Sequence, residues 1–401
     1  MHKLRDLLLG PERAVLVLSF TEILAWGILI YPPVLTAPHM AAEHGWSLAF
    51  CMAGLSVALI VSGMFSPTAC GLIDRHGGNS VMSLGALAGA AGLAGIAVAD
   101  QRITYLLCWL LIGVGMSTTL YDPAFTTLTR IFGASARRQI TFVTFAGGFA
   151  STVGWPATHV LIEQVGWRGA YMTFAAVFVL VVAPLHAFAL PRAVFKSAGG
   201  APASAAPTTT AYLAPHGAAF LLLTAAFGLH AFILSGVTSN LLAMLGRHGI
   251  AASTVVAIGA LFGPSQVVAR LGDFMFASRT SPLWVARVAI LAMAVAFSLM
   301  AILGISPLVA AVFAIMFGAA NGVMTIVRGA LPLHLFGPAG YGRVIGRIAR
   351  PALILQALAP FAVASAIEGL SDSVVLELGA LGAIVALGCF IVVRSPQPVR
   401  Q

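Results

Sequence analysis

Charged residues are scarce in this sequence. Only 8% of its 401 residues are Asp, Glu, Lys or Arg, whereas 60% are hydrophobic. Ordinary soluble domains carry about 25% charged residues, so a soluble fold of this composition would leave far too much apolar surface in water. Lipid is a solvent for such a surface. The composition therefore excludes an ordinary soluble domain and predicts a membrane protein.

Cysteines and enzymatic signatures are also sparse. The four cysteines lie in apolar segments at scattered spacings (Cys51, Cys70, Cys108 and Cys389), which excludes a disulfide framework and a zinc site. No Walker lysine motif, metal-ligand cluster or nucleophile–base pair is present. We therefore expect neither an enzyme nor an ATP-driven pump, and no cofactor.

Long apolar runs are what the sequence has in abundance. A run of about 20 residues crosses roughly 30 Å of hydrocarbon as a helix. Twelve such runs can be placed, near 14–37, 46–70, 80–99, 104–128, 140–162, 168–190, 216–240, 250–274, 283–303, 307–331, 344–367 and 374–393. The first run is too long, and followed by too many others, to be a cleavable signal. These runs predict an all-α membrane protein with twelve transmembrane helices.

The two halves of the sequence match at a constant offset of 204 residues. His44-Gly45 recurs as His248-Gly249, Phe132-Gly133 as Phe336-Gly337, Arg75 as Arg279, and Pro156 as Pro360. Between the copies, residues 191–215 are rich in Ala, Pro, Ser and Thr, which is typical of a flexible linker. We therefore predict pseudo-symmetric six-helix bundles at 1–190 and 216–401, joined by a cytoplasmic linker. Matched halves can enclose a site and rock around it, as in a transporter.

The distribution of basic residues predicts the topology. When the spans alternate from a cytoplasmic N-terminus, three of the 21 Lys and Arg (Arg102, Arg168 and Arg247) lie in outer loops and two lie within spans, so the other 16 face inward. This is the positive-inside bias. It predicts cytoplasmic termini in a cell membrane, and we expect a bacterial inner membrane. The net charge of +9 is thereby explained without a nucleic-acid partner, and we expect none.

Four charged residues stand out at bilayer depth in the predicted spans: Glu22, Asp122, Arg270 and Arg328. A charge at bilayer depth costs about 2.5–3.5 kcal/mol or more, so one kept there usually faces a cavity or a partner. The acids lie in the first half and the bases in the second. Asp122 falls two positions before the repeat equivalent of Arg328, which makes these two plausible partners. We predict proton coupling by Asp122 and Glu22.

Polar residues accompany the arginines at helical spacing. Gln266 shares a helix face with Arg270, and Asn321 shares one with Arg328. Tyr31, followed by Pro32-Pro33, could form a cavity edge or a gate, and His230 could bind substrate or relay a proton. The predicted substrate-binding residues are therefore Arg270, Arg328, Gln266, Asn321, Tyr31 and His230.

Structural alternatives stay open for several of these residues. Arg270 could form a fixed pair with Asp273, and Arg328 could extend to the inner surface. His230 could be a packing residue, and the prolines after Tyr31 could be packing features.

The loop after the second span resembles a known signature. Cys70-Gly71-Leu72-Ile73-Asp74-Arg75-His76-Gly77-Gly78 is similar to the major facilitator superfamily loop Gly-x-Leu-x-Asp-Arg-x-Gly-Arg-Lys, with Cys70 at the leading glycine and Gly78-Asn79 at the basic pair. The resemblance implies the six-plus-six helix fold. It also implies that the aspartate lies against the start of helix 11, where helix N–H groups attract an anion. We therefore assign Asp74 and Arg75 to the inner gate.

Further motifs resemble the monocarboxylate-transporter branch of that family. They are His44-Gly45-Trp46-Ser47, Tyr121-x-Pro123, Arg137-Arg138 and Gly166-Trp167-Arg168. Gln266 and Arg270 occupy the places of that branch's Asp-x-x-x-Arg, whose arginine binds the substrate carboxylate and whose aspartate takes part in proton coupling. Arg270 is retained here and the aspartate is replaced by Gln266. The arginine that drug exporters carry before Gly113-Val114-Gly115 is missing, which counts against a drug/proton antiporter.

Together these features predict a secondary active transporter that moves a small organic anion with a proton by alternating access. We expect a monomer that contacts membrane lipid. One alternative is a proton-driven exporter of hydrophobic or inorganic toxicants. Another is a non-transporting membrane sensor.

Overall fold

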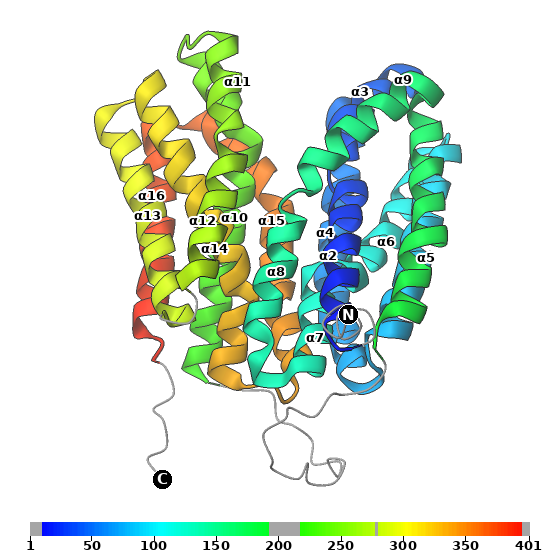
Figure 1. Cartoon of the computed structure of the whole chain (residues 1–401). Coiled ribbons are helices and arrows are strands. Elements are labelled where there is room, and N and C mark those ends of the chain that lie inside the picture. The colour runs from blue at the N-terminus through cyan, green and yellow to red at the C-terminus, as the bar shows by residue number, and fades with distance from the viewer. Residues whose placement is uncertain (1–9, 192–216, 277–279, 395–401) are drawn as a thin grey trace, which may run out of the picture. The chain divides into compact units, whose positions relative to one another are not determined.

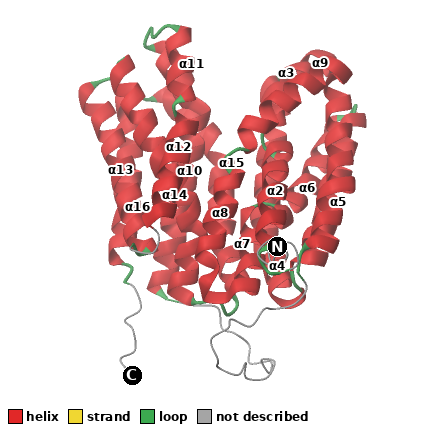
Figure 2. Ribbon diagram, viewed as in Figure 1, coloured by secondary structure: helices red, strands yellow, loops and turns green. Residues whose placement is uncertain are grey.

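The computed structural model describes residues 10–191, 217–276 and 280–394 of the chain. Within these ranges the chain forms helices joined by short loops, with no strand (Figure 2). An α-helix satisfies its backbone N–H and C=O groups internally, which lipid cannot do for it. Arg279 and the predicted linker 191–215, apart from Pro191, lie outside the described residues.

The described chain divides into two compact units. Unit 1 comprises Met1–Pro215 and Phe336–Arg350, and unit 2 comprises His216–Leu335 and Pro351–Gln401. Unit 1 contains α2 (Arg13–Leu29), α3 (Pro32–His44), α4 (Leu48–His76), α5 (Gly78–Val98), α6 (Arg102–Thr119), α7 (Tyr121–Phe132), η1 (Gly133–Ala136), α8 (Arg137–Gly147), α9 (Ala150–Val177), η2 (Phe178–Val182) and η3 (Leu185–Ala189) (Figure 1).

Unit 2 contains α10 (Ala218–Arg247), α11 (Ala252–Ala260), α12 (Phe262–Phe276), α13 (Pro282–Leu303), α14 (Pro307–Phe336), and α16 (Asp372–Val392). Helix α15 (Tyr341–Gly369) contributes to both units, because its first turns pack with unit 1 and the remainder with unit 2.

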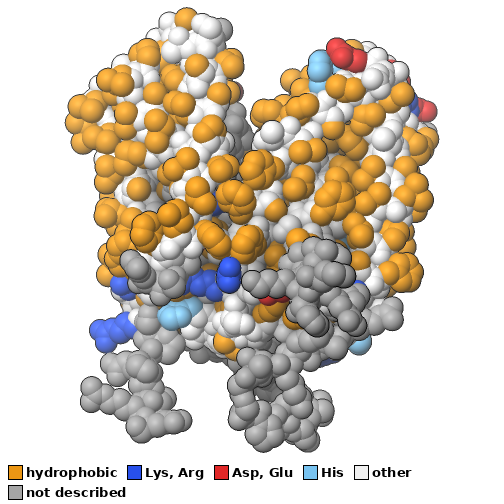
Figure 3. Space-filling model, in the orientation of Figure 1, with side chains coloured by type: hydrophobic (Ala, Val, Ile, Leu, Met, Phe, Trp, Pro, Cys, Tyr) orange, Lys and Arg blue, Asp and Glu red, His pale blue; other side chains and the backbone are white. Residues whose placement is uncertain are grey.

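Ten helical segments in the described residues are long and apolar enough to cross a membrane. One of them, Arg102–Ala189, runs for 88 residues and covers three of the predicted spans, whereas each of the others corresponds to one. The exact count of twelve stays a prediction. Hydrophobic side chains cover the visible sides of each unit, and charged side chains gather near its ends (Figure 3). This is the surface of a multi-pass membrane protein.

The repeat is visible in the backbone at its glycines. Gly45 and its equivalent Gly249 have φ of 66° and 75°, and Gly133 and its equivalent Gly337 have φ of 60° and 76°. This left-handed region is readily adopted by glycine, which has no Cβ to clash. Gly45 ends α3 in this conformation. The corresponding glycines of the two halves therefore share a positive φ.

An ionic cluster joins three elements at one end of unit 1. Gly166, with φ of 72°, interrupts α9, and Arg168 just beyond it forms ion pairs with Glu43 at 2.9 Å and Asp100 at 2.6 Å. The Trp167 indole N–H also donates to Glu43, at 2.6 Å. Two of the motifs from the sequence, Gly166-Trp167-Arg168 and His44-Gly45-Trp46-Ser47, thus meet around Glu43.

Unit 2 carries an equivalent cluster with its charges reversed. Asp372 pairs with Arg247 and with His248, each at 2.8 Å. The repeat offset relates Glu43 to Arg247 and Arg168 to Asp372, so each pair holds the same two elements of its half with opposite signs. The pairing has been retained while the charges have been exchanged.

This arrangement predicts that a reversed pair is tolerated in unit 2. Arg247→Glu places two acids together and should lower the thermal midpoint of the purified protein, because exposed pairs contribute about 0.2–1 kcal/mol. The double variant Arg247→Glu/Asp372→Arg should regain most of this loss. Exposed Glu377, also in α16, provides the control variant Glu377→Arg. A double variant less stable than Arg247→Glu would show that the pairing does not depend on charge complementarity.

Candidate functional site

The charged cluster of unit 2 is built where α12 and α14 cross. A Cβ placed on Gly322 of α14 would lie 2.6 Å from the carbonyl oxygen of Gln266 in α12. Gly318, one turn earlier, makes a similar approach to Phe262. Small residues allow membrane helices to approach at backbone distance, so glycine sets the separation of these two helices.

The guanidinium of Arg270 lies at this crossing. Arg270 is only 4% exposed, its Nε donates to the Gly322 carbonyl at 3.1 Å, and one terminal nitrogen donates to the Gln266 amide oxygen at 3.3 Å. The predicted shared face of Gln266 and Arg270 is therefore present. Arg270 is directed into the unit and away from the lipid-facing surface.

His230, Asn321 and Arg328 supply further polar atoms within unit 2. His230 of α10 is 8% exposed and has the Arg328 guanidinium as an electrostatic neighbour. Among the described residues, neither the His230 Nε2 atom nor the Asn321 Oδ1 atom has a hydrogen-bond partner. Buried polar atoms are nearly always satisfied, so these two are positions where a ligand could supply the partner.

Two carboxyl groups come together in unit 1. Glu22 of α2 is fully buried, and among the described residues neither of its carboxyl oxygens has a hydrogen-bond partner. Its electrostatic neighbours are the Trp26 side chain and the carboxyl group of Asp122, which is itself 6% exposed. The Trp26 ring lies 4.9 Å from the ring of Tyr121, next to Asp122. The two predicted proton-coupling residues thus form one cluster.

Tyr31 occupies the break between α2 and α3. Helix α2 ends at Leu29 and α3 begins at Pro32, so the distortion predicted from Pro32-Pro33 is present. The Tyr31 ring contacts Trp155 edge to face, with 6.0 Å between centroids. Its role as a cavity edge stays a prediction.

Asp74, one of the two predicted gate residues, contacts the start of α15. The Asp74 carboxylate accepts hydrogen bonds from the backbone N–H groups of Gly342 and Arg343, each at 3.1 Å. This is the contact that the family resemblance implies, and the helix N-terminus favours the negative charge. Arg75 is exposed. Arg130, which the sequence did not single out, donates to the Asp74 carbonyl oxygen.

Other buried contacts were not predicted. His186 is fully buried, and its Nε2 lies 3.0 Å from the Thr21 hydroxyl, beside Glu22 in the chain. Spacing along the sequence gives no signal for a contact between residues 165 positions apart. The pairing of Asp122 with Arg328 joins the two units and stays a prediction, and the alternative pairing of Arg270 with Asp273 stays open.

Long apolar helices bury Glu22 and Asp122 in unit 1 and Arg270 and Asp273 in unit 2, so the chain is a multi-pass membrane protein with charged groups in the interior of both units. The sequence matches the model of the Major Facilitator Superfamily over residues 15–349. The chain belongs to this family of transporters.

Part of the chain is similar to two named relatives. The chain is 32% identical to human monocarboxylate transporter 11 over 140 residues, which is 34% of this chain and 29% of the relative. The mouse protein of that name is 33% identical over 143 residues, 35% of this chain and 31% of the relative. Each match thus spans less than a third of the relative's length.

Solved structures share the fold over almost the whole chain. The human organic anion transporter MFSD10 (TETRAN) has a TM-score of 0.71 at 15% identity, covering 95% of this chain and 99% of that one. The fucose:proton symporter FucP of E. coli has a TM-score of 0.71 at 14% identity, covering 96% of this chain and 98% of that one. The proton:xylose symporter XylE has a TM-score of 0.70 at 11% identity, covering 96% of this chain and 97% of that one. At these identities the likeness shows the fold alone.

The close crossing of α12 and α14 predicts that Gly322 tolerates no side chain. Gly322→Ala should destabilise the purified protein by about 1–3 kcal/mol, because the added methyl group overlaps the Gln266 backbone. Gly272→Ala in α12 is the matched control, since a Cβ there meets no atom within 4 Å. The measurement is the thermal midpoint of both variants in detergent. Equal midpoints would show that Gly322 does not set the helix separation.

Proposed function

We propose that this chain is a secondary active transporter that moves a small organic anion together with a proton by alternating access. The observation that carries the proposal is the position of Arg270, a guanidinium buried where α12 and α14 cross. A carboxylate is a stronger acceptor for a guanidinium than an amide or a carbonyl, and it can engage two N–H groups at once. An organic acid therefore suits this position.

The substrate site includes the polar neighbours of Arg270 in unit 2. Arg328 adds a second positive charge, while His230 and Asn321 offer the unsatisfied atoms Nε2 and Oδ1. Gln266 orients Arg270, and Tyr31 of unit 1 serves as a cavity edge. The similarity to monocarboxylate transporter 11 supports a monocarboxylate-like substrate.

Proton coupling is assigned to Glu22 and Asp122. A buried carboxyl group takes up a proton more readily beside another carboxylate than beside a cation. A substrate that draws a guanidinium away from one of these acids would therefore favour proton uptake there, so that anion and proton travel together. FucP and XylE, both proton symporters by name, support coupling of this kind in the same fold.

The proposal includes the domain arrangement, the membrane orientation and the oligomeric state of the protein. The halves at 1–190 and 216–401 rock about the site, with 191–215 as a cytoplasmic linker. Both termini lie on the cytoplasmic side of a bacterial inner membrane, and the protein acts as a monomer. The excess of Lys and Arg in the inward-facing loops supports this orientation.

Arg270 provides the sharpest test of the substrate class. In proteoliposomes with an inward pH gradient, Arg270→Gln and Arg270→Lys should each abolish uptake of labelled lactate, pyruvate, oxalate-like or aromatic acids, because lysine lacks the planar fork. Arg102→Gln, at an exposed residue of α6, should leave uptake unchanged. Both Arg270 variants should elute as folded protein. Uptake preserved in folded Arg270→Gln would overturn the assignment.

Variants of Glu22 and Asp122 test the proton coupling separately from the substrate class. Glu22→Gln and Asp122→Asn should each uncouple flux, so that substrate exchange persists while acidification of the vesicle interior during uptake falls at least about tenfold. A pH-sensitive dye inside the vesicles reports the protons, and labelled substrate reports the flux. Coupling by these acids is refuted when both variants still acidify the interior as the unaltered protein does.

Measurements in cells and in the vesicles distinguish the alternatives. An exporter of hydrophobic or inorganic toxicants would make cells accumulate the compound when the proton gradient is collapsed. A sensor would bind ligand and give no flux. Uptake of an organic acid driven by an inward proton gradient is the result expected here.

A further inference from the structure

One buried histidine of unit 1 has no role in the proposed site. His186 lies in η3, a π-helical turn, and is fully buried. Its Nε2 lies 3.0 Å from the Thr21 hydroxyl of α2. Its Nδ1 has the Met82 backbone as a neighbour, yet no atom of the described residues completes a hydrogen bond to it. An ionisable side chain at membrane depth is costly and usually serves function.

The backbone around His186 is held in an unusual conformation by α5. Turns of π-helix are rare, and they occur frequently at functional sites. Two side chains of α5 donate to carbonyl oxygens of this segment, Asn79 to Leu190 at 2.6 Å and Ser83 to Ala183 at 3.0 Å. Because these bonds satisfy carbonyl groups of the distorted segment, they stabilise the turn that keeps His186 in the interior of unit 1.

Unit 2 shows that the fold does not require a histidine at this position. The repeat equivalent of His186 is Phe390 of α16, which is fully buried. Its ring contacts Phe227 of α10 edge to face, with 5.7 Å between centroids. Arg287 of α13, the repeat equivalent of Ser83, donates to the Phe390 carbonyl oxygen at 2.9 Å. A side-chain bond to the backbone of the last helix is thus present in both halves, whereas the imidazole is present only in unit 1.

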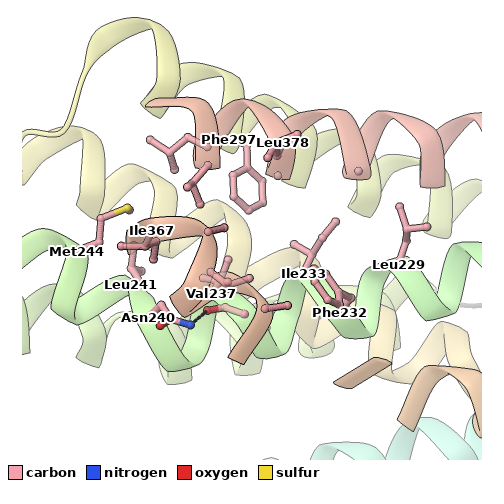
Figure 4. A pocket seen from close by; sticks show the side chains of 18 of the residues that line it. Leu229, Phe232, Ile233, Val237, Asn240, Leu241, Met244, Phe297, Ile367 and Leu378 are labelled. Atoms are coloured by element: carbon pink, nitrogen blue, oxygen red, sulfur yellow. Dashed lines mark hydrogen bonds between the residues drawn. The ribbon is translucent and has the colours of Figure 1, made fainter. Parts of the chain in front are cut away.

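The interior beside α10 and α16 is apolar as well. A cavity of about 340 Å³ lies between these helices and α15, and among the described residues that line it Asn240 is the one polar side chain (Figure 4). In the repeat, α10 corresponds to α2 and α16 to the segment that contains η3. Unit 1 therefore has a polar contact, Thr21 with His186, where unit 2 has an aromatic one. A phenyl ring would fill the position without burying an unsatisfied nitrogen.

His186 extends from the gate end of unit 1 toward the proposed proton-coupling acids. Asn79, which donates to the His186 carbonyl oxygen at 3.4 Å, lies in the first turn of α5, directly after the loop of Asp74. At its other end, the imidazole contacts Thr21, which precedes Glu22 in α2. A neutral imidazole can accept a proton at one nitrogen and release one from the other, which suits it to proton transfer.

We propose that His186 is a proton-transfer residue, which passes the coupled proton from the side of Glu22 to the cytoplasmic end of unit 1. The inference rests on the proposed proton coupling by Glu22 and Asp122. The Thr21 hydroxyl gives a proton to Nε2 as it receives one from the Glu22 carboxyl group, and Nδ1 releases a proton to water. Only N–H and O–H bonds form and break. The ring ends neutral, with its proton on the other nitrogen.

Proteoliposomes of the full-length protein test this role, with labelled lactate, pyruvate, oxalate-like and aromatic acids as probes. His186→Phe introduces the side chain that unit 2 has at this position, and His186→Gln keeps a hydrogen-bonding group beside Thr21 that does not titrate. Each variant should lower uptake driven by an inward pH gradient at least about tenfold, because proton transfer by a positioned side chain contributes that much or more. Exchange of labelled for unlabelled acid at equal pH, which needs no net proton transfer, should be unchanged.

The control is His159→Gln, at an exposed histidine of α9, which should change neither rate. His186→Gln decides the matter if His186→Phe elutes as aggregate. Gradient-driven uptake by His186→Gln at the rate of the unaltered protein would overturn the proton-transfer role. An equal loss of uptake and exchange would also overturn it, because that pattern marks a structural role. Failure of the unaltered protein to take up any of these acids would instead refute the proposed function, on which the inference rests.

Discussion

The crossing of α12 and α14 at Gly322 is the contact on which the charged site of unit 2 depends. Since Gly322 has no side chain, the two backbones approach at the distance of the Gln266 carbonyl. That approach exposes the Gly322 carbonyl oxygen to the Arg270 guanidinium at 3.1 Å. The same residue therefore sets the helix separation and provides an acceptor for the buried cation. An unsatisfied buried charge costs several kcal/mol. A substitution at Gly322 that moved the helices apart would therefore also weaken the bond that satisfies Arg270.

The two halves of the internal repeat share backbone conformation at positions beside which their side-chain charges differ. Gly45 and Gly249 both have a positive φ, yet the ion pairs beside them have opposite signs, Glu43 with Arg168 in one unit and Arg247 with Asp372 in the other. An ion pair depends on opposite signs and on distance, and either partner can carry either sign. The backbone turn has no such freedom, because a Cβ would clash there. The two halves can therefore differ in which partner of an ion pair carries which charge. They cannot easily differ in the glycine at the turn.

Much of the fold could be predicted from the sequence because its signals are local. Apolar runs, the prolines after Tyr31 and the paired glycines each act within a few residues, so span positions, the break after Leu29 and the repeat register could be predicted. The gate contact of Asp74 could be predicted only through resemblance to a family. Contacts made across long separations gave no such signal, including that of His186 with Thr21 and that of Glu22 with Asp122. Such contacts depend on how helices rotate about their axes, which a uniformly apolar run leaves unspecified.

The repeat also explains how one fold could handle an anion and a proton with different residues. Trp26 and His230 are repeat equivalents, and each places an aromatic nitrogen near a charged group, Glu22 in unit 1 and Arg328 in unit 2. Position on the helix is therefore shared while the sign of the neighbouring charge is reversed. A carboxyl group can release or accept a proton near neutral pH once its surroundings change, whereas a guanidinium keeps its charge and binds anions. In the proposed mechanism, Glu22 and Asp122 exchange the proton and Arg270 and Arg328 bind the anion, so the two roles fall to residues of different halves.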